Sequence, residues 1–169
     1  SDNINGGIKG SPKFPQPLIY EFLLRYYISQ KKLPALNVVE STLTNMAYGG
    51  IYDQIGGGFH RYSMDEYWTV PHFEKMLYDN ALLSKLYLHL YQITNNPLYL
   101  KIVEETLDYI KTEMTDEKGG FFSAEDADSD GQEGTFYLWP YDELDSLLSK
   151  KDFHYILNSI TLRERNILI

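Results

Sequence analysis

The chain has 169 residues, of which 43% are apolar, and this length and composition predict a single domain with a buried core. Its formal net charge of −9 disfavours nucleic acid as a partner, because such binding depends on basic surfaces that displace phosphate counterions. No apolar run reaches the roughly 18 residues of a membrane-spanning helix, and the lack of cysteine excludes disulfides and fits a reducing compartment, so we expect a cytoplasmic protein with no membrane partner.

The first part of the chain predicts a loop followed by two helices. Glycines and prolines punctuate residues 1–15, which we expect to form a loop. Apolar residues then recur at helical spacing over residues 17–30 and again over residues 35–48. Pro34 separates the two helices, and the pair Gly49-Gly50 ends the second one.

A long loop then leads into a predicted helical hairpin. Residues 71–94 carry an apolar stripe, and Pro71 suits a first helical turn, so the helix is expected to hold His72, Glu74 and Lys75 at its amino end. Asn95-Asn96-Pro97 predicts a turn. Residues 97–114 repeat the apolar stripe with a period close to 3.6, so the two helices are expected to pack against each other.

The last part of the chain begins with a loop rich in glycine and aspartate. Residues 135–139 then predict a short strand, and residues 142–150 predict a fifth helix. Apolar residues from Phe153 onward predict a sixth segment without a clear cap.

Glycine pairs followed by an apolar residue precede the predicted helices. They are Gly6-Gly7, Gly49-Gly50, Gly57-Gly58 and Gly119-Gly120. Helical hairpins separated in this way stack into solenoids or closed toroids, because one hairpin cannot bury its own apolar face. A simple four-helix bundle with coincidental glycine loops is the alternative.

Three runs of sequence resemble one family of proteins. The first is short, GSPKFP at residues 10–15, whereas GGIYDQIGGGFHRYSMDEYWTVPHFEKMLYDNALL at 49–83 and GGFFSAEDADSDGQEGTFYLW at 119–139 are long and specific. They are similar to the spermatogenesis-associated protein 20 family, also called the YyaL-type thioredoxin-domain proteins. The resemblance spans nearly the whole chain up to Leu144, and departs where Ile8 and Ile51 replace phenylalanine after a glycine pair.

This resemblance implies an all-α fold, namely the first part of an α/α toroid of the six-hairpin glycosidase and N-acylglucosamine 2-epimerase type, with at most a short strand pair. In that family a thioredoxin-like domain precedes the toroid. The resemblance therefore implies that residues 1–169 form one incomplete domain, which lacks the thioredoxin-like domain and the remaining hairpins. It indicates a fold more than a reaction.

The stretch from residue 56 to residue 82 concentrates candidate functional residues. Its glycine triplet predicts tight turning or close approach of the backbone to another segment. Epimerisation beside a carbonyl needs an acid and a base, and histidine serves as either at neutral pH, so His60 and His72 are candidate catalytic residues. Either histidine could instead be a structural residue that bonds to backbone or to a carboxylate.

Glycoside hydrolysis would use carboxylates in place of histidines. It requires two of them at a separation of roughly 5 to 9.5 Å across the scissile bond. Glu74, Asp79, Glu125, Asp126 and Asp128 could supply them, and of these Glu74, Glu125 and Asp126 are the catalytic candidates. Asp79 has a simpler interpretation as the ion-pair partner of Lys75, four residues earlier on the predicted helix.

Aromatic, basic and amide side chains in the same loops are candidate substrate-binding residues. Aromatic rings stack on sugars, although they equally fill cores. The candidates are Arg61, Tyr62, Trp68, Lys75, Tyr78, Asn80 and Phe121.

The acidic loop matches part of a calcium-binding motif. Asp126, Asp128, Asp130 and Gly131 stand at positions one, three, five and six, but Tyr137 replaces the bidentate glutamate of position twelve. A solvated acidic loop or a pocket rim is therefore favoured over a calcium site. Neither a zinc motif nor a phosphate-binding glycine loop is present, and we expect no metal and no cofactor.

Two classes of function remain open. The first is a sugar-active enzyme, an epimerase or a glycoside hydrolase, that takes a small sugar-like ligand in a toroid funnel. The second is a non-catalytic carbohydrate-binding or scaffold domain that accompanies the thioredoxin-like domain of the same protein. A partial toroid would leave apolar edges exposed, so self-association of the chain is also expected.

Overall fold

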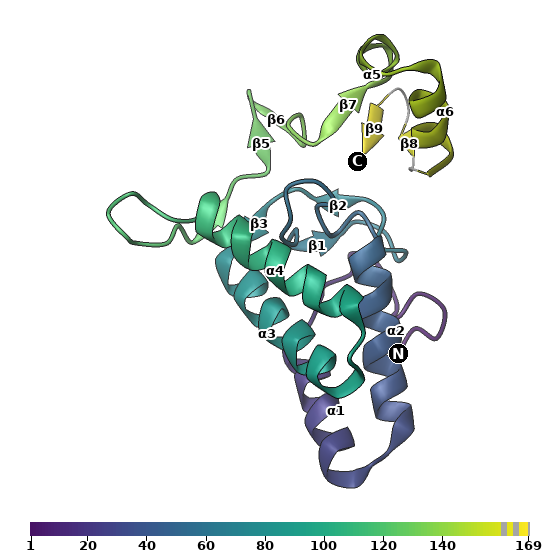
Figure 1. Cartoon of the computed structure of the whole chain (residues 1–169), viewed down its shortest axis with the longest axis vertical. Helices are drawn as coiled ribbons and strands as arrows, with labels where there is room; N and C mark the ends of the chain where they lie inside the picture. The colour runs from purple at the N-terminus through teal and green to yellow at the C-terminus, as the bar shows by residue number, and fades with distance from the viewer. Residues whose placement is uncertain (160–161, 164–165, 169) are drawn as a thin grey trace.

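A computed structural model of the chain describes residues 1–159, 162–163 and 166–168. Helices α1 (Pro17–Gln30) and α2 (Leu33–Tyr48) form one hairpin, and α3 (Leu77–Thr94) and α4 (Pro97–Thr112) form another. The hairpins meet where α1 lies against α3. Figure 1 shows that α1 and α3 both begin, and α2 and α4 both end, on the side of the molecule that carries the strand-bearing loops.

Short antiparallel strands connect these loops. β1 (Tyr62–Ser63) pairs with β2 (Pro71–His72), β3 (Lys75–Met76) with β4 (Ala124–Glu125), and β5 (Asp128–Ser129) with β6 (Gln132–Glu133). The predicted all-α fold of helical hairpins is confirmed, but within the described residues it carries several short strand pairs where at most one was expected.

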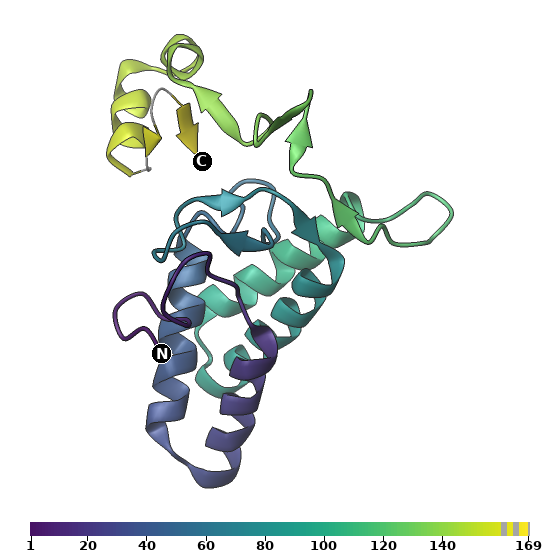
Figure 2. The ribbon, with the colours of Figure 1, turned by 180° about the vertical axis from the view of Figure 1, so that it is seen from behind.

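The carboxyl-terminal segment lies beyond the loops, on the far side from the helices, as Figures 1 and 2 both show. It contains a three-stranded sheet in the order β7 (Leu138–Pro140), β9 (Asn166–Leu168), β8 (Leu162–Arg163). Helices α5 (Tyr141–Leu147) and α6 (Lys150–Ser159) pack together beside it. The predicted strand and fifth helix are therefore present near the expected positions, and α6 accounts for the start of the predicted sixth segment, whose residues 160–161, 164–165 and 169 lie outside the described range.

The core forms where the apolar stripes of the four long helices meet. Phe59, Trp68 and Tyr87 are its largest fully buried side chains beside Tyr99. Tyr87 directs its hydroxyl to the Leu43 carbonyl at 2.7 Å, so the polar end of this buried ring is satisfied. The loop residues Phe59 and Trp68 are thus buried among the helix residues of the core, which fixes the loops on the bundle.

The predicted start of the third helix at Pro71 is wrong. Residues 71–76 are extended, because their backbone groups bond to other segments: the Arg61 N–H donates to the Glu74 carbonyl at 2.8 Å, and Lys75 pairs with Glu125. Helix α3 begins at Leu77 instead. His72, Glu74 and Lys75 therefore do not lie at a helix amino terminus, and the dipole of α3 does not act on them directly.

The glycine triplet brings backbone against helix α4, as its composition predicted. Gly57 and Gly58 adopt left-handed conformations with φ of 75° and 79°. A Cβ at Gly57 would lie 2.7 Å from the Glu105 carbonyl oxygen, and one at Gly58 would lie 2.5 Å from the Tyr109 ring. Because neither residue has a Cβ, the loop can approach the helix this closely, and both positions require glycine.

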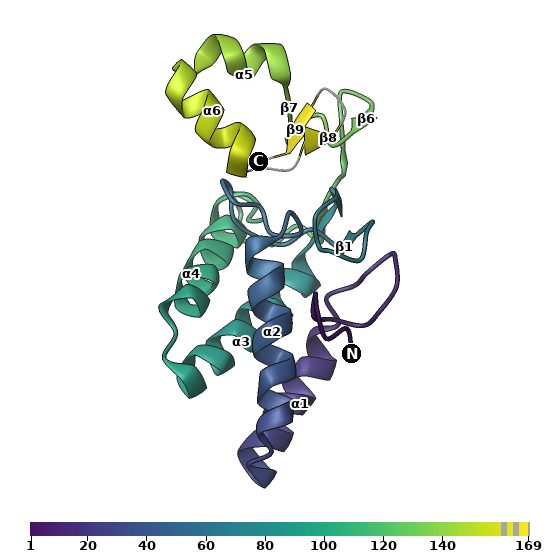
Figure 3. The ribbon, with the colours of Figure 1, turned by 90° about the vertical axis from the view of Figure 1, so that its right-hand side faces the viewer.

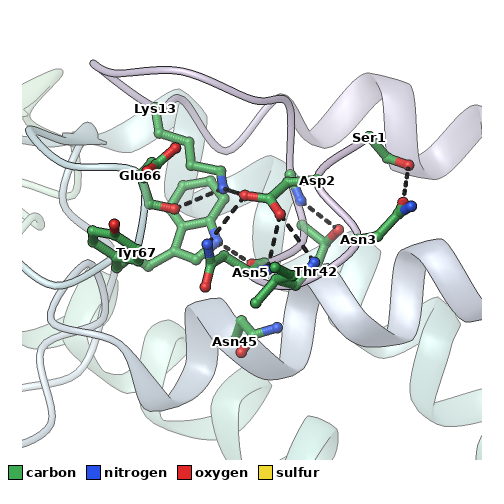
Figure 4. Close-up of polar contacts among 12 residues, drawn as sticks. Ser1, Asp2, Asn3, Asn5, Lys13, Thr42, Asn45, Glu66 and Tyr67 are labelled. Atoms are coloured by element: carbon green, nitrogen blue, oxygen red, sulfur yellow. Dashed lines mark hydrogen bonds and ion pairs between the residues drawn. The ribbon is translucent and has the colours of Figure 1, made fainter.

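The amino-terminal loop is attached to the body by a buried lysine. Lys13 pairs with Asp2 at 3.0 Å and donates to the Glu66 carbonyl at 2.8 Å, as Figure 4 shows. Backbone and side-chain donors, including Lys13, hold the pKa of Asp2 well below its usual range. Seen from the side in Figure 3, this loop lies next to the start of α1, close to the strand-bearing end.

Asn80 fixes the loop around Phe59 to helix α3. Its amide accepts from the Phe59 N–H at 2.6 Å and donates to the Phe59 carbonyl at 3.0 Å, and its side chain is fully buried. Replacing Asn80 by alanine would leave both backbone groups without partners. We expect the free energy of unfolding, measured with urea, to fall by about 2–4 kcal/mol.

Asn37, an exposed asparagine on α2, provides the matched control. Asn37→Ala removes the same side chain without orphaning any buried group, so it should change stability by less than about 0.5 kcal/mol. Equal effects of the two substitutions would show that the Asn80 amide does not support the loop.

Candidate functional site

The candidate site occupies the strand-bearing end of the two helical hairpins. It has an inner part, in which buried polar groups satisfy one another, and an outer part of partly exposed charged groups. The inner part holds the loops in place. The outer part has the groups that could meet a ligand.

Lys75 is the centre of the inner part. Its Nζ is buried, donates to Asp53 Oδ2 at 2.8 Å and to the Gly57 carbonyl at 2.9 Å, and lies 4.2 Å from the Tyr109 ring centroid. Burial alone would raise the pKa of Asp53, but the charge and hydrogen bond of Lys75 and two backbone N–H groups bring it below the usual value. The sequence-based prediction that Lys75 pairs with Asp79 is wrong, because Lys75 lies on β3 before the helix begins and faces Asp53.

Glu125 belongs to the loop that follows Gly119-Gly120, and it completes the inner part. Its carboxylate accepts from the Tyr109 hydroxyl and, at 3.2 Å, from the Tyr137 hydroxyl. Burial, followed by these bonds to Glu125, raises the pKa of Tyr109, and burial with the Glu125 charge raises the pKa of Tyr137. Both phenols are therefore neutral donors at physiological pH, and Glu125 is held by two hydrogen bonds.

His60 is buried and directs Nδ1 to the Phe73 carbonyl at 3.1 Å. Its ring meets Tyr137 edge-on, with the centroids 4.8 Å apart. Burial, followed by the nearby charge of Lys75, lowers the pKa of His60 to about 3. The imidazole is neutral near pH 7 and does not supply a proton there, which corrects its interpretation as an acid group in proton transfer.

His72 lies in the outer part and is partly exposed. Its Nδ1 is 2.6 Å from Glu133 Oε1, and its ring stacks on Tyr62 with the centroids 4.9 Å apart. Its Nε2 stands 3.7 Å from Glu74 Oε2, which is longer than a hydrogen bond. With Nδ1–H donated to Glu133, Nε2 carries the lone pair that can accept a proton.

Arg61 and Glu74 complete this outer cluster. The guanidinium pairs with Glu74 Oε2 at 2.8 Å, while the buried Nε of Arg61 has no hydrogen-bond partner.

The candidate residues His60, His72 and Glu125 lie near one another. Tyr137 contacts both His60 and Glu125, and His72 is close enough to His60 to influence its pKa.

A cavity of about 320 Å³ opens between the amino ends of α1 and α3. Phe14 and Tyr78 line it with the buried carboxyl group of Asp79. The Phe14 ring lies 4.8 Å from the Tyr62 ring, and Tyr62 stacks on His72, so the cavity adjoins the histidine cluster. Tyr78 is the predicted substrate-binding residue that the structure places in this cavity.

Other predicted residues lie away from the cavity. Trp68 and Asn80, which were predicted to bind substrate, are fully buried, and their side chains bond to the loop backbone. Asp126 is exposed and accepts from the Asp128 N–H. Phe121 is exposed on the loop that follows α4, where Thr115 bridges to it.

The acidic loop forms a β-hairpin. Asp130 and Gly131 turn between β5 and β6 with φ of 53° and 77°, the geometry that a two-residue hairpin turn requires. Among the described residues, no group of three histidine or acidic side chains is placed to hold a metal ion. The hairpin instead brings Glu133 to His72.

Sequence reasoning did not name Asp53, Tyr109, Tyr137 or Glu133 as site residues. Asp53 could have been identified as a turn residue, because its carboxylate accepts from the N–H groups of Ile55 and Gly56, next to the glycines. The Asp130-Gly131 pair signals the hairpin that carries Glu133. The tyrosines have no distinctive local signal.

No family model matches the chain. Spermatogenesis-associated protein 20 of Mus musculus is 43% identical in an alignment of 157 residues, and the match covers 87% of this chain and 20% of that protein. The chain therefore spans about a fifth of the length of this curated relative.

No helix among the described residues is long and apolar enough to cross a membrane.

Two solved structures share the fold. A sugar epimerase from a ruminal bacterium superposes with a TM-score of 0.65 at 16% identity, covering 93% of this chain and 47% of that protein. A family 76 glycoside hydrolase from a bovine Bacteroides thetaiotaomicron strain superposes with a TM-score of 0.56 at 16% identity, covering 87% of this chain and 34% of that protein. This chain thus resembles one segment of spermatogenesis-associated protein 20, and it folds as part of an α/α toroid.

Proposed function

We propose that the chain forms one wall of a sugar-handling toroid in which His72 transfers a proton to and from the substrate. The observation that carries the proposal is the His72 cluster. Glu133 holds Nδ1 at 2.6 Å and leaves Nε2 directed toward a partly exposed charged surface. A histidine oriented in this way by a carboxylate is suited to abstract a proton beside a carbonyl.

Neighbouring groups support an epimerase or an isomerase more than a glycosidase. Glu125 is held by two tyrosine hydroxyls, and Glu74 by Arg61, so neither of these predicted carboxylates stands free to attack or protonate a glycosidic bond. Arg61 could neutralise the negative charge that develops on a carbonyl oxygen when the adjacent carbon loses its proton. Tyr62 and Phe14 offer aromatic faces for a sugar ring.

The proposal includes further parts of a longer protein. The chain corresponds to 47% of the epimerase on which it superposes and to 20% of its curated relative. We propose that the remaining hairpins complete the toroid and that a thioredoxin-like domain precedes it. A catalytic partner for His72 on the opposite face of the sugar would then come from those hairpins.

A non-catalytic carbohydrate-binding or scaffold domain is the second candidate. The burial of His60 favours it, because the chain then offers one accessible histidine of the two expected for an acid and base pair. Both candidates predict a ligand at the cavity, but only the first predicts chemical change.

The test is to incubate the protein that contains the complete toroid with reducing sugars in deuterated water. An epimerase or isomerase would incorporate deuterium beside the carbonyl, detected by proton NMR, and would release an isomerised sugar. Binding without exchange would support the second candidate. The absence of both binding and exchange would contradict the proposed function.

Self-association is expected of the 169-residue chain. Helix α1 exposes the apolar side chains Leu18, Phe22 and Ile28 beside Ile19 and Tyr26. We predict that light scattering detects dimers or larger species, and that Phe22→Glu reduces their population. Leu107→Glu, the same type of change at an exposed residue of α4, is the control, and a stable monomer of the parent chain would contradict the prediction.

A further inference from the structure

The cavity between α1 and α3 contains a negative charge that no basic side chain balances. Asp79 lines the cavity, and its side chain is only 7% exposed. No ion pair joins Asp79 to a lysine, arginine or histidine in the part of the chain that the structure describes. Burying a carboxylate without a cation costs free energy, and a cation that pairs with the carboxylate offsets this cost.

Nearby charged groups do not remove this imbalance. Burial raises the pKa of Asp79 to about 6, although the positive charge of Arg61 and a hydrogen bond with Tyr78 oppose the shift, and the negative charge of Glu74 adds to it. Arg61 is already paired with Glu74 at 2.8 Å. The net charge of the three groups Arg61, Glu74 and ionised Asp79 is therefore negative.

Aromatic rings provide the second half of a site for an organic cation. Phe14 and Tyr78 line the same cavity as Asp79, and both rings are partly exposed. Aromatic faces attract ammonium groups, and a carboxylate beside them adds a charge-assisted hydrogen bond. A volume of about 320 Å³ falls at the small end of the roughly 300–1,000 Å³ found for small-molecule sites.

We propose that this cavity binds a protonated primary amine carried by a sugar-sized ring, with Asp79 as its counter-ion and Phe14 and Tyr78 as its aromatic walls. The sugar part of the ligand rests on the proposed function, whereas the amine part rests on the cavity alone. The substrate class is therefore an amino sugar with a free amine, and an N-acylated sugar, which has no positive charge there, is disfavoured.

The test is titration of the 169-residue chain, labelled with ¹⁵N, with glucosamine, N-acetylglucosamine, glucose and cyclohexylamine at pH 7.5, followed by NMR. Glucosamine should bind at least ~10-fold more tightly than the two uncharged sugars, because only it pairs with Asp79. Its affinity should fall below pH 6, as Asp79 becomes protonated in the presence of Arg61, Glu74 and Tyr78.

Asp79→Asn should abolish the preference for glucosamine while retaining the fold, since it removes an unpaired buried charge. Asp108→Asn, at an exposed position of α4, is the control with the same change in net charge and should leave the preference intact. A preference for glucosamine that survives Asp79→Asn would overturn the amine site.

The four ligands separate failure of the amine site from failure of the proposed function. Equal binding of all three sugars would refute the amine site and leave the sugar-handling proposal standing. Binding of cyclohexylamine without any sugar would support the amine site and contradict the sugar part of its ligand. The absence of binding by every ligand would refute the amine site, whereas sugar handling is decided by the exchange test on the complete toroid.

Discussion

Replacing Lys75 by methionine is expected to lower the free energy of unfolding by about 3–5 kcal/mol, because it leaves the buried carboxylate of Asp53 without its cation. Lys75 is 1% exposed, and its Nζ bonds to both Asp53 and the Gly57 carbonyl. Urea denaturation at pH 7.5 measures the loss. Lys101→Met is the control, since Lys101 is exposed and pairs with Glu105 at only 3.6 Å, and its loss should cost less than about 1 kcal/mol.

The pH dependence of stability tests whether the unpaired charge of Asp53 causes the loss of stability in Lys75→Met. In the parent chain the pKa of folded Asp53 lies below its unfolded value, so the pair contributes stability above the unfolded pKa, and this contribution is lost as the pH falls through the folded pKa. In Lys75→Met, burial dominates and raises the pKa of Asp53. The defect of the variant should therefore be largest at pH 7.5 and should shrink as the pH falls and Asp53 takes up a proton.

A second substitution tests the same cause from the other side. Asp53→Asn removes the charge and keeps the Oδ1 acceptor for the N–H groups of Ile55 and Gly56. The double variant Asp53→Asn/Lys75→Met should be more stable than Lys75→Met alone. A double variant that is less stable would show that the packing of the lysine between Tyr109 and Tyr137, and not its charge, carries the effect.

The long helices could be predicted from the sequence because their signals are local. Helix α1 has the predicted bounds, and α4 ends two residues before the predicted position, since apolar stripes and prolines lie within the helices themselves. The start of α3 could not be predicted in the same way. Residues 71–76 have helical spacing, but Lys75 pairs with Glu125, fifty residues later, and this pairing decides their conformation.

The candidate site was predictable only in part for the same reason. Arg61, His72 and Glu74 belong to one stretch of sequence, and the structure does bring them together. Glu133 reaches His72 from sixty-one residues away, through a hairpin, so its role depends on tertiary structure. Burial is also non-local: His60 and Trp68 have the side chains expected of a binding loop, yet packing places both in the interior.

Replacing His72 by glutamine in the protein that contains the complete toroid is expected to reduce deuterium exchange into the sugar by about 10²–10⁴-fold, the usual contribution of a positioned acid or base. Glutamine keeps a polar side chain of similar length, but its amide nitrogen has no lone pair that accepts a proton, so the proton-accepting nitrogen is lost. Proton NMR of the exchange rate at saturating sugar measures the effect.

Two further variants distinguish chemistry from binding. Glu133→Gln should reduce exchange less than His72→Gln does, because it weakens the orientation of the imidazole but leaves Nε2 in place. His89→Gln, on helix α3 where His89 bonds to Glu21, should leave exchange unchanged. If His72→Gln retained the parent exchange rate while the sugar still bound, His72 would not be the proton-transfer group, and the base would have to come from the hairpins that complete the toroid.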